Sequence, residues 1–227
     1  MNFEALDVAN DARALEKLLA LGVRNVPVLA KGEQFIFAQN FEDIAEFVGL
    51  QGADHVPLAP DVLIAKWLHV YRATQRYIQQ LPDEHLPERV IPNRDRSIRF
   101  MGHHIFRIGE AFLETVVDGA DYAPLFANKP PPDGEFNSGR AIADYGAQVT
   151  QRLGAWWDTV PDRRCANKVP TFFGPQPVHL LLERSTWHSA QHARQLIAVL
   201  QRYGIEPEAP LTADDLRGLP LPERLWE

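Results

Sequence analysis

The chain has 227 residues, 45% of them apolar, and a formal net charge of −7 at pH 7. This length can bury a substantial core in one or two domains, and an acidic chain without a Lys/Arg run lacks the electrostatic footprint for nucleic acid or an anionic membrane. No apolar stretch reaches the roughly 18 residues of a membrane span. The first residues lack the basic start and apolar block of a secretory signal, so we expect a cytoplasmic protein.

The first 50 residues show short patterns in the order strand, helix, strand, strand, helix. The expected elements are a strand over 3–8, a helix over 11–21, hairpin strands over 25–29 and 34–38, and a helix over 41–48. Gly22 is a plausible end for the first helix. Residues 51–59 combine Gly, Pro and small polar residues, which predicts a linker.

Residues 60–204 are predicted to form an antiparallel four-helix bundle, so the fold class is mainly α. Helical spacing of apolar residues predicts helices over 60–80, 97–117, 138–160 and 177–203. Pro60 suits a first helical position and Ser97 an N-cap. Bundles of this kind hold metals and ligands among their facing helices. Residues 205–227, rich in proline and acidic residues, are expected to lie over the surface as a tail.

The strongest local motif is the pair His188 and His192 in the last predicted helix. Residues four apart share a helical face, so both imidazoles can reach one metal ion. His104 shares a face with apolar residues of the second helix and is predicted to be the third ligand, whereas His103 shares a face with Arg107 and is expected to point outward. Three histidines with one open position are typical of a catalytic divalent metal site. The alternative is a set of ordinary hydrogen-bonded core histidines.

Two segments carry a family resemblance, MGHHIFRIGEAFL at 101–113 and STWHSAQHARQL at 185–196. They resemble the DinB/YfiT-like superfamily of metal-binding four-helix bundles. The resemblance covers about residues 61–203 and implies the ligands His104, His188 and His192. A shift of one residue would make His103 the ligand instead, but the family's ligand is typically followed by an aliphatic residue, and Ile105 follows His104.

The first 50 residues resemble the last two thirds of a glutaredoxin, and LGVRNVPVLAKGEQFIFAQNFEDIAEFVGL at 21–50 matches the stretch with its Val-Pro, hairpin and final helix. That family has a cis peptide bond before the proline, and the residue before it pairs with glutathione through its backbone, which implies Val26 and Pro27 here. Its last helix begins beside the γ-glutamyl end, which implies Asn40 and Asp43. The first strand and the redox cysteine motif of the family are absent, so disulfide reductase activity is excluded.

The chain contains one cysteine, Cys165, which excludes an intramolecular disulfide and a cysteine-based zinc site. Arg163 and Arg164 could lower the pKa of this thiol, as in a reactive cysteine. We interpret Cys165 as an incidental loop thiol.

Together the two resemblances imply a metal-dependent enzyme that uses a low-molecular-weight thiol, with glutathione as the expected one. Bacillithiol transferases and mycothiol-dependent isomerases are DinB-like enzymes of this kind. The expected reaction is S-transfer, isomerisation or dehalogenation of a small electrophile. Arg184, one turn before His188, is a candidate for holding a carboxylate of the substrate or of glutathione. It could equally form an ordinary interhelical salt bridge.

Two other functions stay open at this point. One is a hydrolase with metal-activated water, for which Glu110 and Glu183 are candidate general bases by sequence proximity. The other is a non-catalytic protein with a structural metal or a bound ligand. Three imidazoles accept zinc, nickel or iron. A homodimer is expected, because a sheet that lacks its first strand has an exposed edge.

Overall fold

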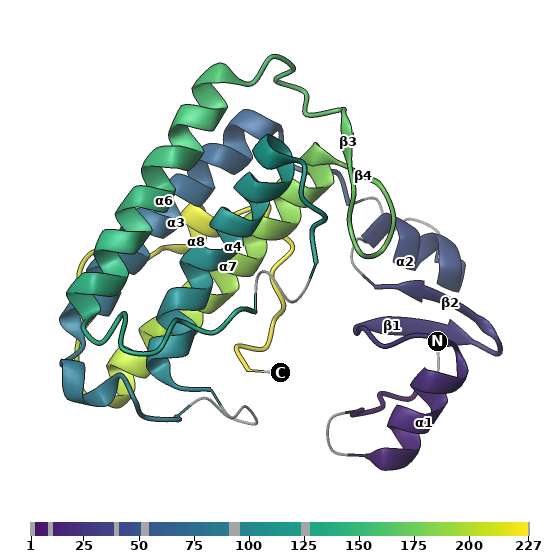
Figure 1. Ribbon diagram of the computed structural model, residues 1–227, viewed down its shortest axis with the longest axis horizontal. Helices are drawn as coiled ribbons and strands as arrows, with labels where there is room; N and C mark the ends of the chain where they lie inside the picture. The colour runs from purple at the N-terminus through teal and green to yellow at the C-terminus, as the bar shows by residue number, and fades with distance from the viewer. Residues whose placement is uncertain are drawn as a thin grey trace. The chain divides into compact units, whose positions relative to one another are not determined.

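The computed structural model describes residues 3–8, 11–38, 41–50, 55–90, 96–123 and 128–226. The chain divides into two compact units, Met1–His55 and Val56–Glu227 (Figure 1). Each unit is described by itself. None of the helices in the described ranges is long and apolar enough to cross a lipid bilayer.

The first unit contains α1 (Ala12–Ala20), β1 (Val28–Lys31), β2 (Gln34–Phe37) and α2 (Phe41–Val48). The two strands form an antiparallel hairpin in which Lys31 pairs with Gln34 across the turn. Asp11 caps α1, since its carboxylate accepts a hydrogen bond from the backbone N–H of Arg13 at 2.9 Å.

The strand predicted over residues 3–8 is wrong, because the structure shows no strand there. A strand is stable only when its backbone finds a partner and one of its faces is buried. Phe3 is 80% exposed and Leu6 is 41% exposed, so neither apolar side chain gains from a packed face.

The second unit is built on four long helices, α3 (Pro60–Gln80), α4 (Ile98–Asp118), α6 (Gly139–Thr159) and α7 (Val178–Arg202). The hydroxyl of Ser97 accepts from the backbone N–H of Phe100, and Ser138 caps α6 in the same way. Gly119 ends α4 at a φ of 73°, which glycine adopts without steric cost. The predicted mainly helical fold class is confirmed.

The four helices do not simply alternate in direction. α4 and α6 run parallel, because Gly102 lies against Ile142 and Glu110 lies against Arg152 further along both helices. The long connection between them carries the chain back to the end where α4 begins. α4 and α7 run antiparallel. In consequence, the first half of α4 faces the middle of α7.

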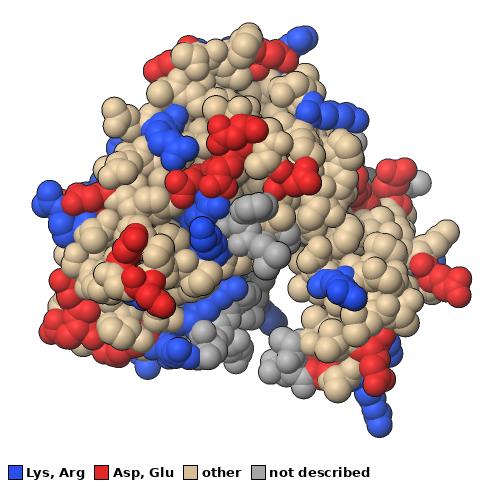
Figure 2. Space-filling model, viewed as in Figure 1, with Lys and Arg blue, Asp and Glu red and all other residues tan. Residues whose placement is uncertain are grey.

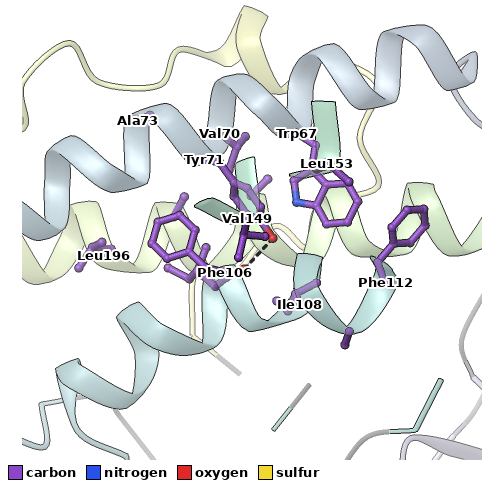
Figure 3. Close-up of a cluster of buried hydrophobic side chains, with 14 of the residues drawn as sticks. Trp67, Val70, Tyr71, Ala73, Phe106, Ile108, Phe112, Val149, Leu153 and Leu196 are labelled. Carbon is purple, nitrogen blue, oxygen red and sulfur yellow. Dashed lines mark hydrogen bonds between the residues drawn. The ribbon is translucent and has the colours of Figure 1, made fainter. Parts of the chain in front are cut away.

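Aromatic side chains fill the centre of the bundle (Figure 3). The rings of Trp67 and Phe112 lie 5.3 Å apart, and those of Tyr71 and Phe106 lie 5.1 Å apart, both nearly edge to face. Burying one such side chain contributes about 1.5–3 kcal/mol to folding. The Tyr71 hydroxyl donates to the backbone carbonyl of Ile105 at 2.9 Å. This bond joins α3 to α4 one residue after His104.

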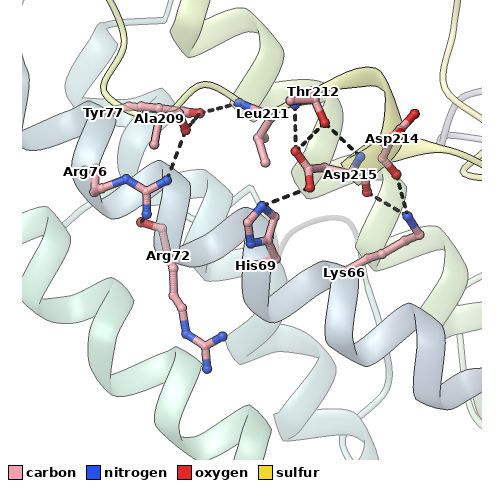
Figure 4. A network of polar contacts seen from close by, with 10 residues as sticks. All are labelled: Lys66, His69, Arg72, Arg76, Tyr77, Ala209, Leu211, Thr212, Asp214 and Asp215. Atoms are coloured by element: carbon pink, nitrogen blue, oxygen red, sulfur yellow. Dashed lines mark hydrogen bonds and ion pairs between the residues drawn. The ribbon is translucent and has the colours of Figure 1, made fainter.

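The shorter elements of this unit are η1 (Asp83–His85), β3 (Lys168–Val169), β4 (Gln176–Pro177) and α8 (Ala213–Leu216). α8 belongs to the C-terminal tail, which packs on α3 (Figure 4). There Lys66 donates to the backbone carbonyl of Asp215 at 2.8 Å, and Arg76 donates to that of Ala209 at 3.2 Å. Acidic and basic side chains are interspersed on the face shown in Figure 2.

Candidate metal centre

Three histidines from two helices meet inside the bundle. His104 comes from the second turn of α4, and His188 and His192 lie one turn apart on α7. One ring nitrogen of each histidine lies within 4.8 Å of the corresponding nitrogens of the other two. Among the described residues, no other group of three or more His, Cys, Asp or Glu side chains converges in this way. The structure therefore brings together the three predicted ligands.

The rings are arranged to point their nitrogens at one place. The His104 ring lies 5.5 Å from that of His188 and 5.0 Å from that of His192, at interplanar angles of 71° and 74°. The Nε2 atoms of His188 and His192 are 3.1 Å apart. A tetrahedral zinc ion with Zn–N bonds of about 2.0–2.1 Å needs ligand nitrogens separated by roughly 3.4 Å. The spacing thus fits a divalent ion after a small opening of the cluster.

The donor chemistry fits a metal as well. Nδ1 of His192 lies 2.7 Å from Oε1 of Gln195, one turn further along α7. An amide oxygen only accepts, so Nδ1 carries the proton and Nε2 of His192 carries the lone pair that a metal requires. Sequence reasoning had not assigned Gln195 a role, although its i+3 spacing from His192 was a usable signal.

The centre is covered on one side and open on another. His104 is 2% exposed, whereas His188 and His192 are only half-buried. The ring of Phe100 stacks on His104 with centroids 6.0 Å apart, and that of Trp187 lies 5.8 Å from His188. Aromatic side chains therefore pack beside the three histidines, and His188 and His192 remain partly accessible to solvent.

The prediction that His103 points outward is wrong. His103 is 5% exposed, and its ring stacks on Tyr145 of α6 with centroids 5.3 Å apart and planes 13° apart. Phe136 covers it at 5.0 Å. Burial, with a contribution from nearby Arg107, lowers the pKa of His103 to about 4. His103 is a neutral core residue that faces α6, away from the three converging histidines.

His103 was expected to face solvent because the charged residue Arg107 lies on the same face of α4. Arg107 is 4% exposed, and its guanidinium pairs with Glu114 at 2.8 Å and with Glu110 at 3.3 Å. Paired in this way, the charge can be buried. The hydroxyl of Tyr145 donates to Glu110 at 2.6 Å, and burial raises the pKa of that phenol well above its usual value.

Arg184, the predicted catalytic residue, lies one turn before His188 and contacts Tyr122. Its guanidinium donates to the Tyr122 hydroxyl at 3.2 Å and lies 5.7 Å above that ring. Tyr122 follows the end of α4, so Arg184 joins α7 to the connection that leaves α4.

The residues predicted to dock glutathione lie in the first unit. The peptide bond between Val26 and Pro27 is cis, as the glutaredoxin resemblance implies, and Val26 is 49% exposed. Asp43 is exposed in the first turn of α2. Asn40 lies outside the described residues.

Cys165 is buried in the loop between α6 and α7, and burial raises the pKa of its thiol. The hypothesis that Arg163 and Arg164 activate it is therefore wrong, since desolvation of the thiolate is the dominant effect. Its backbone N–H donates to the carbonyl of Asp162 at 3.0 Å and its carbonyl accepts from His179 at 2.9 Å. Cys165 is a structural loop residue.

Comparisons with known proteins agree with this arrangement. The model of the DinB superfamily matches residues 66–196, which include all three histidines. No curated protein matches the chain. Among solved structures, a DinB-like protein from Bacillus cereus ATCC 10987 has 18% sequence identity and a TM-score of 0.52, over 66% of this chain and 95% of that one. The chain therefore belongs to the DinB superfamily of metal-binding helical proteins.

Proposed function

We propose that the protein is a metal-dependent enzyme that activates a low-molecular-weight thiol, with glutathione as the first candidate. The thiol would act in S-transfer, isomerisation or dehalogenation of a small electrophile. The observation that carries the proposal is the convergence of His104, His188 and His192.

The three imidazoles would hold the ion, with zinc, nickel or iron as candidates. When bound, a divalent cation lowers the pKa of a coordinated thiol and so supplies thiolate at neutral pH. The chain's own residues set the conditions for this. His188 and His192 are only half-buried, which leaves the thiol a way in, and Gln195 keeps the lone pair of His192 directed at the site.

The acidic residues favour a thiol over water as the nucleophile. A hydrolase needs a general base within hydrogen-bond reach of its water. No carboxylate of the described residues joins the histidine cluster. Glu110, one candidate base, instead binds Tyr145, Arg107 and Arg152 between α4 and α6. A thiol is far more acidic than water before it is bound, so a cation at the centre would complete its ionisation at neutral pH without such a base.

In an S-transfer or dehalogenation, the sulfur lone pair would form the new C–S bond while the leaving group departs with the electrons of the bond that breaks. The proton lost by the thiol passes to solvent through the open side of the centre. Arg184 supports this scheme as a cation one turn from His188, where it would hold a substrate carboxylate beside the Tyr122 hydroxyl.

Glutathione is supported by the first unit. In glutaredoxins the residue before this proline pairs with the tripeptide backbone, and the corresponding Val26 is 49% exposed here. Asp43 lies at the start of α2, where backbone N–H groups favour a carboxylate. We propose that this surface docks glutathione through backbone hydrogen bonds.

The test is calorimetry of the zinc-loaded protein with glutathione, after elemental analysis of the purified chain. Heat at millimolar glutathione, abolished in His188→Ala, is expected. S-methylglutathione is the matched control, because it keeps the tripeptide and lacks an ionisable thiol. Equal binding of both compounds, or no binding of either, would contradict thiol activation. A chain that unfolds when a chelator removes the ion would indicate a structural metal.

A further inference from the structure

We propose that the C-terminal segment 222–226 is part of the metal centre, because it sets the tautomer of His192 through Gln195. This inference rests on the proposed metal site and extends it to residues that supply no ligand. Gln195 and the carbonyl of Leu225 are therefore assigned as positioning groups.

The hydrogen bonds leave one consistent assignment of protons. Nε2 of Gln195 donates to the carbonyl oxygen of Leu225 at 2.8 Å. A backbone carbonyl only accepts, so the amide nitrogen must face the tail and Oε1 must face His192. Oε1 lies 2.7 Å from Nδ1 of His192 and accepts its proton. The lone pair is thereby left on Nε2 of His192, which accepts from Nε2 of His188 at 3.1 Å; an ion at the centre would replace that proton.

Two further side chains hold the tail in place for this task. Gln191 also donates to the Leu225 carbonyl at 2.8 Å, so both lone pairs of that oxygen are used. Arg194 donates to Oε1 of Gln191 at 2.8 Å and to the carbonyl of Pro222 at 3.0 Å. The guanidinium only donates, which fixes the orientation of the Gln191 amide. The Leu225 carbonyl is therefore held by contacts in addition to the one with Gln195.

An earlier part of the tail is anchored elsewhere, which provides a control. Around α8, the tail binds α3 through Lys66 and His69, and Thr212 and Asp215 form a capping box (Figure 4). None of these contacts involves Gln195 or the three histidines. Loosening them should change the stability of the fold and leave the orientation of His192 intact.

A wrong tautomer would weaken metal binding without removing a ligand. If the Gln195 amide turned over, its N–H group would face Nδ1 of His192, and the imidazole proton would move to Nε2. That nitrogen would then have to lose its proton before it could bind an ion. Removing a residue that orients a metal-ligating histidine typically weakens metal affinity 10- to 100-fold.

The test measures zinc affinity by competition with a chromogenic chelator, using four changes in the full chain. Gln195→Leu removes both bonds and is expected to weaken binding about 10–100-fold. Gln195→Glu still accepts from Nδ1 and is expected to bind zinc at least as well as the wild type. Deletion of 222–227 is expected to weaken binding about 2- to 10-fold, the effect of one lost hydrogen bond. Lys66→Met is expected to leave the affinity unchanged.

The decisive comparison is the deletion made in the Gln195→Glu background. The amide that the tail orients is then gone, so the deletion is expected to have no further effect. An equal loss in both backgrounds would overturn the proposal, as would a Glu variant that binds as weakly as the Leu variant. The absorption spectrum of the cobalt-loaded protein should change in Gln195→Leu and not in Lys66→Met. A wild type that binds neither metal would instead refute the metal site itself.

Discussion

His103 and His104 are neighbours on α4, both nearly inaccessible to solvent, yet their two sides of the helix differ in chemistry. On the α7 side, one ring nitrogen of His104 meets nitrogens of two other imidazoles, all within 4.8 Å of one another. On the α6 side, His103 is stacked between Tyr145 and Phe136, and its Nδ1 has no hydrogen-bond partner among the described residues.

The difference shows that burial of a histidine does not by itself indicate function. What distinguishes the two sides is whether the ring nitrogens of several histidines converge. His104 joins nitrogens that can share an ion, whereas His103 contributes an aromatic surface and tolerates an unpaired polar atom. Substitutions on each side should therefore separate metal binding from stability.

The largest effect is expected on the α7 side. His104→Ala removes one of three ligands, and zinc affinity should fall by more than the roughly 100-fold that a supporting residue can cost. Competition with a chelator measures this. The matched variant is His103→Ala, which should bind zinc as the wild type does. Loss of zinc in His103→Ala would show that the register of the ligand is shifted by one residue.

The next effect concerns His103 itself. His103→Ala leaves a cavity beside Tyr145 and should lower the free energy of unfolding by about 2–3 kcal/mol. His103→Phe keeps the ring and removes the unpaired Nδ1, so its stability should equal or exceed that of the wild type. Urea denaturation of both variants separates the two effects. A Phe variant as unstable as the Ala variant would mean that the imidazole nitrogens matter here.

Tyr145→Phe should have a smaller effect. It removes the 2.6 Å hydrogen bond to Glu110 and keeps the ring that stacks on His103. A hydrogen bond to a charged group contributes about 1.5–3 kcal/mol, and the lower end is expected because Glu110 keeps two arginine partners. Thermal unfolding measures the loss. Altered zinc affinity would be contrary to the separation of the two sides.

The smallest effect is expected for Arg152→Met. Arg152 is 51% exposed and its ion pair with Glu110 spans 3.1 Å. Exposed pairs contribute about 0.2–1 kcal/mol, and salt screens them. Urea denaturation at low and high salt should show a small difference that vanishes at high salt. A loss as large as that of Tyr145→Phe would indicate that the Glu110 network acts as one unit.

The helices and the convergence of the three histidines could be predicted because their signals are local. Pro60, Ser97 and Ser138 stand where caps and first turns belong, and an i,i+4 histidine pair shares a face whatever surrounds it. The expectation that His104 faces the core is met because its neighbours along the helix are apolar.

What could not be predicted depends on contacts between distant segments. The place of His103 follows from the pairing of Arg107 with Glu114, which makes a charged face buriable. The parallel run of α4 and α6 follows from a long connection without a regular pattern. The hydrogen bond from Gln195 to the Leu225 carbonyl joins residues 30 positions apart, and no sequence motif in the tail predicts it.

Gly109 limits how this protein can change over time. A Cβ atom at that position would lie 2.5 Å from the Tyr71 hydroxyl, which is tied to the carbonyl of Ile105. An alanine there would displace a buried side chain that joins α3 to α4 beside a metal-ligand candidate. Which side chains are tolerated at residue 109 therefore depends on the side chain at residue 71. A Gly109→Ala change should be harmful next to tyrosine, because the ring atoms Cε2 and Cζ of Tyr71 would also lie 2.9 and 3.1 Å from the new Cβ, and it should be tolerated only next to a smaller side chain. This is a form of epistasis built into the packing of two helices.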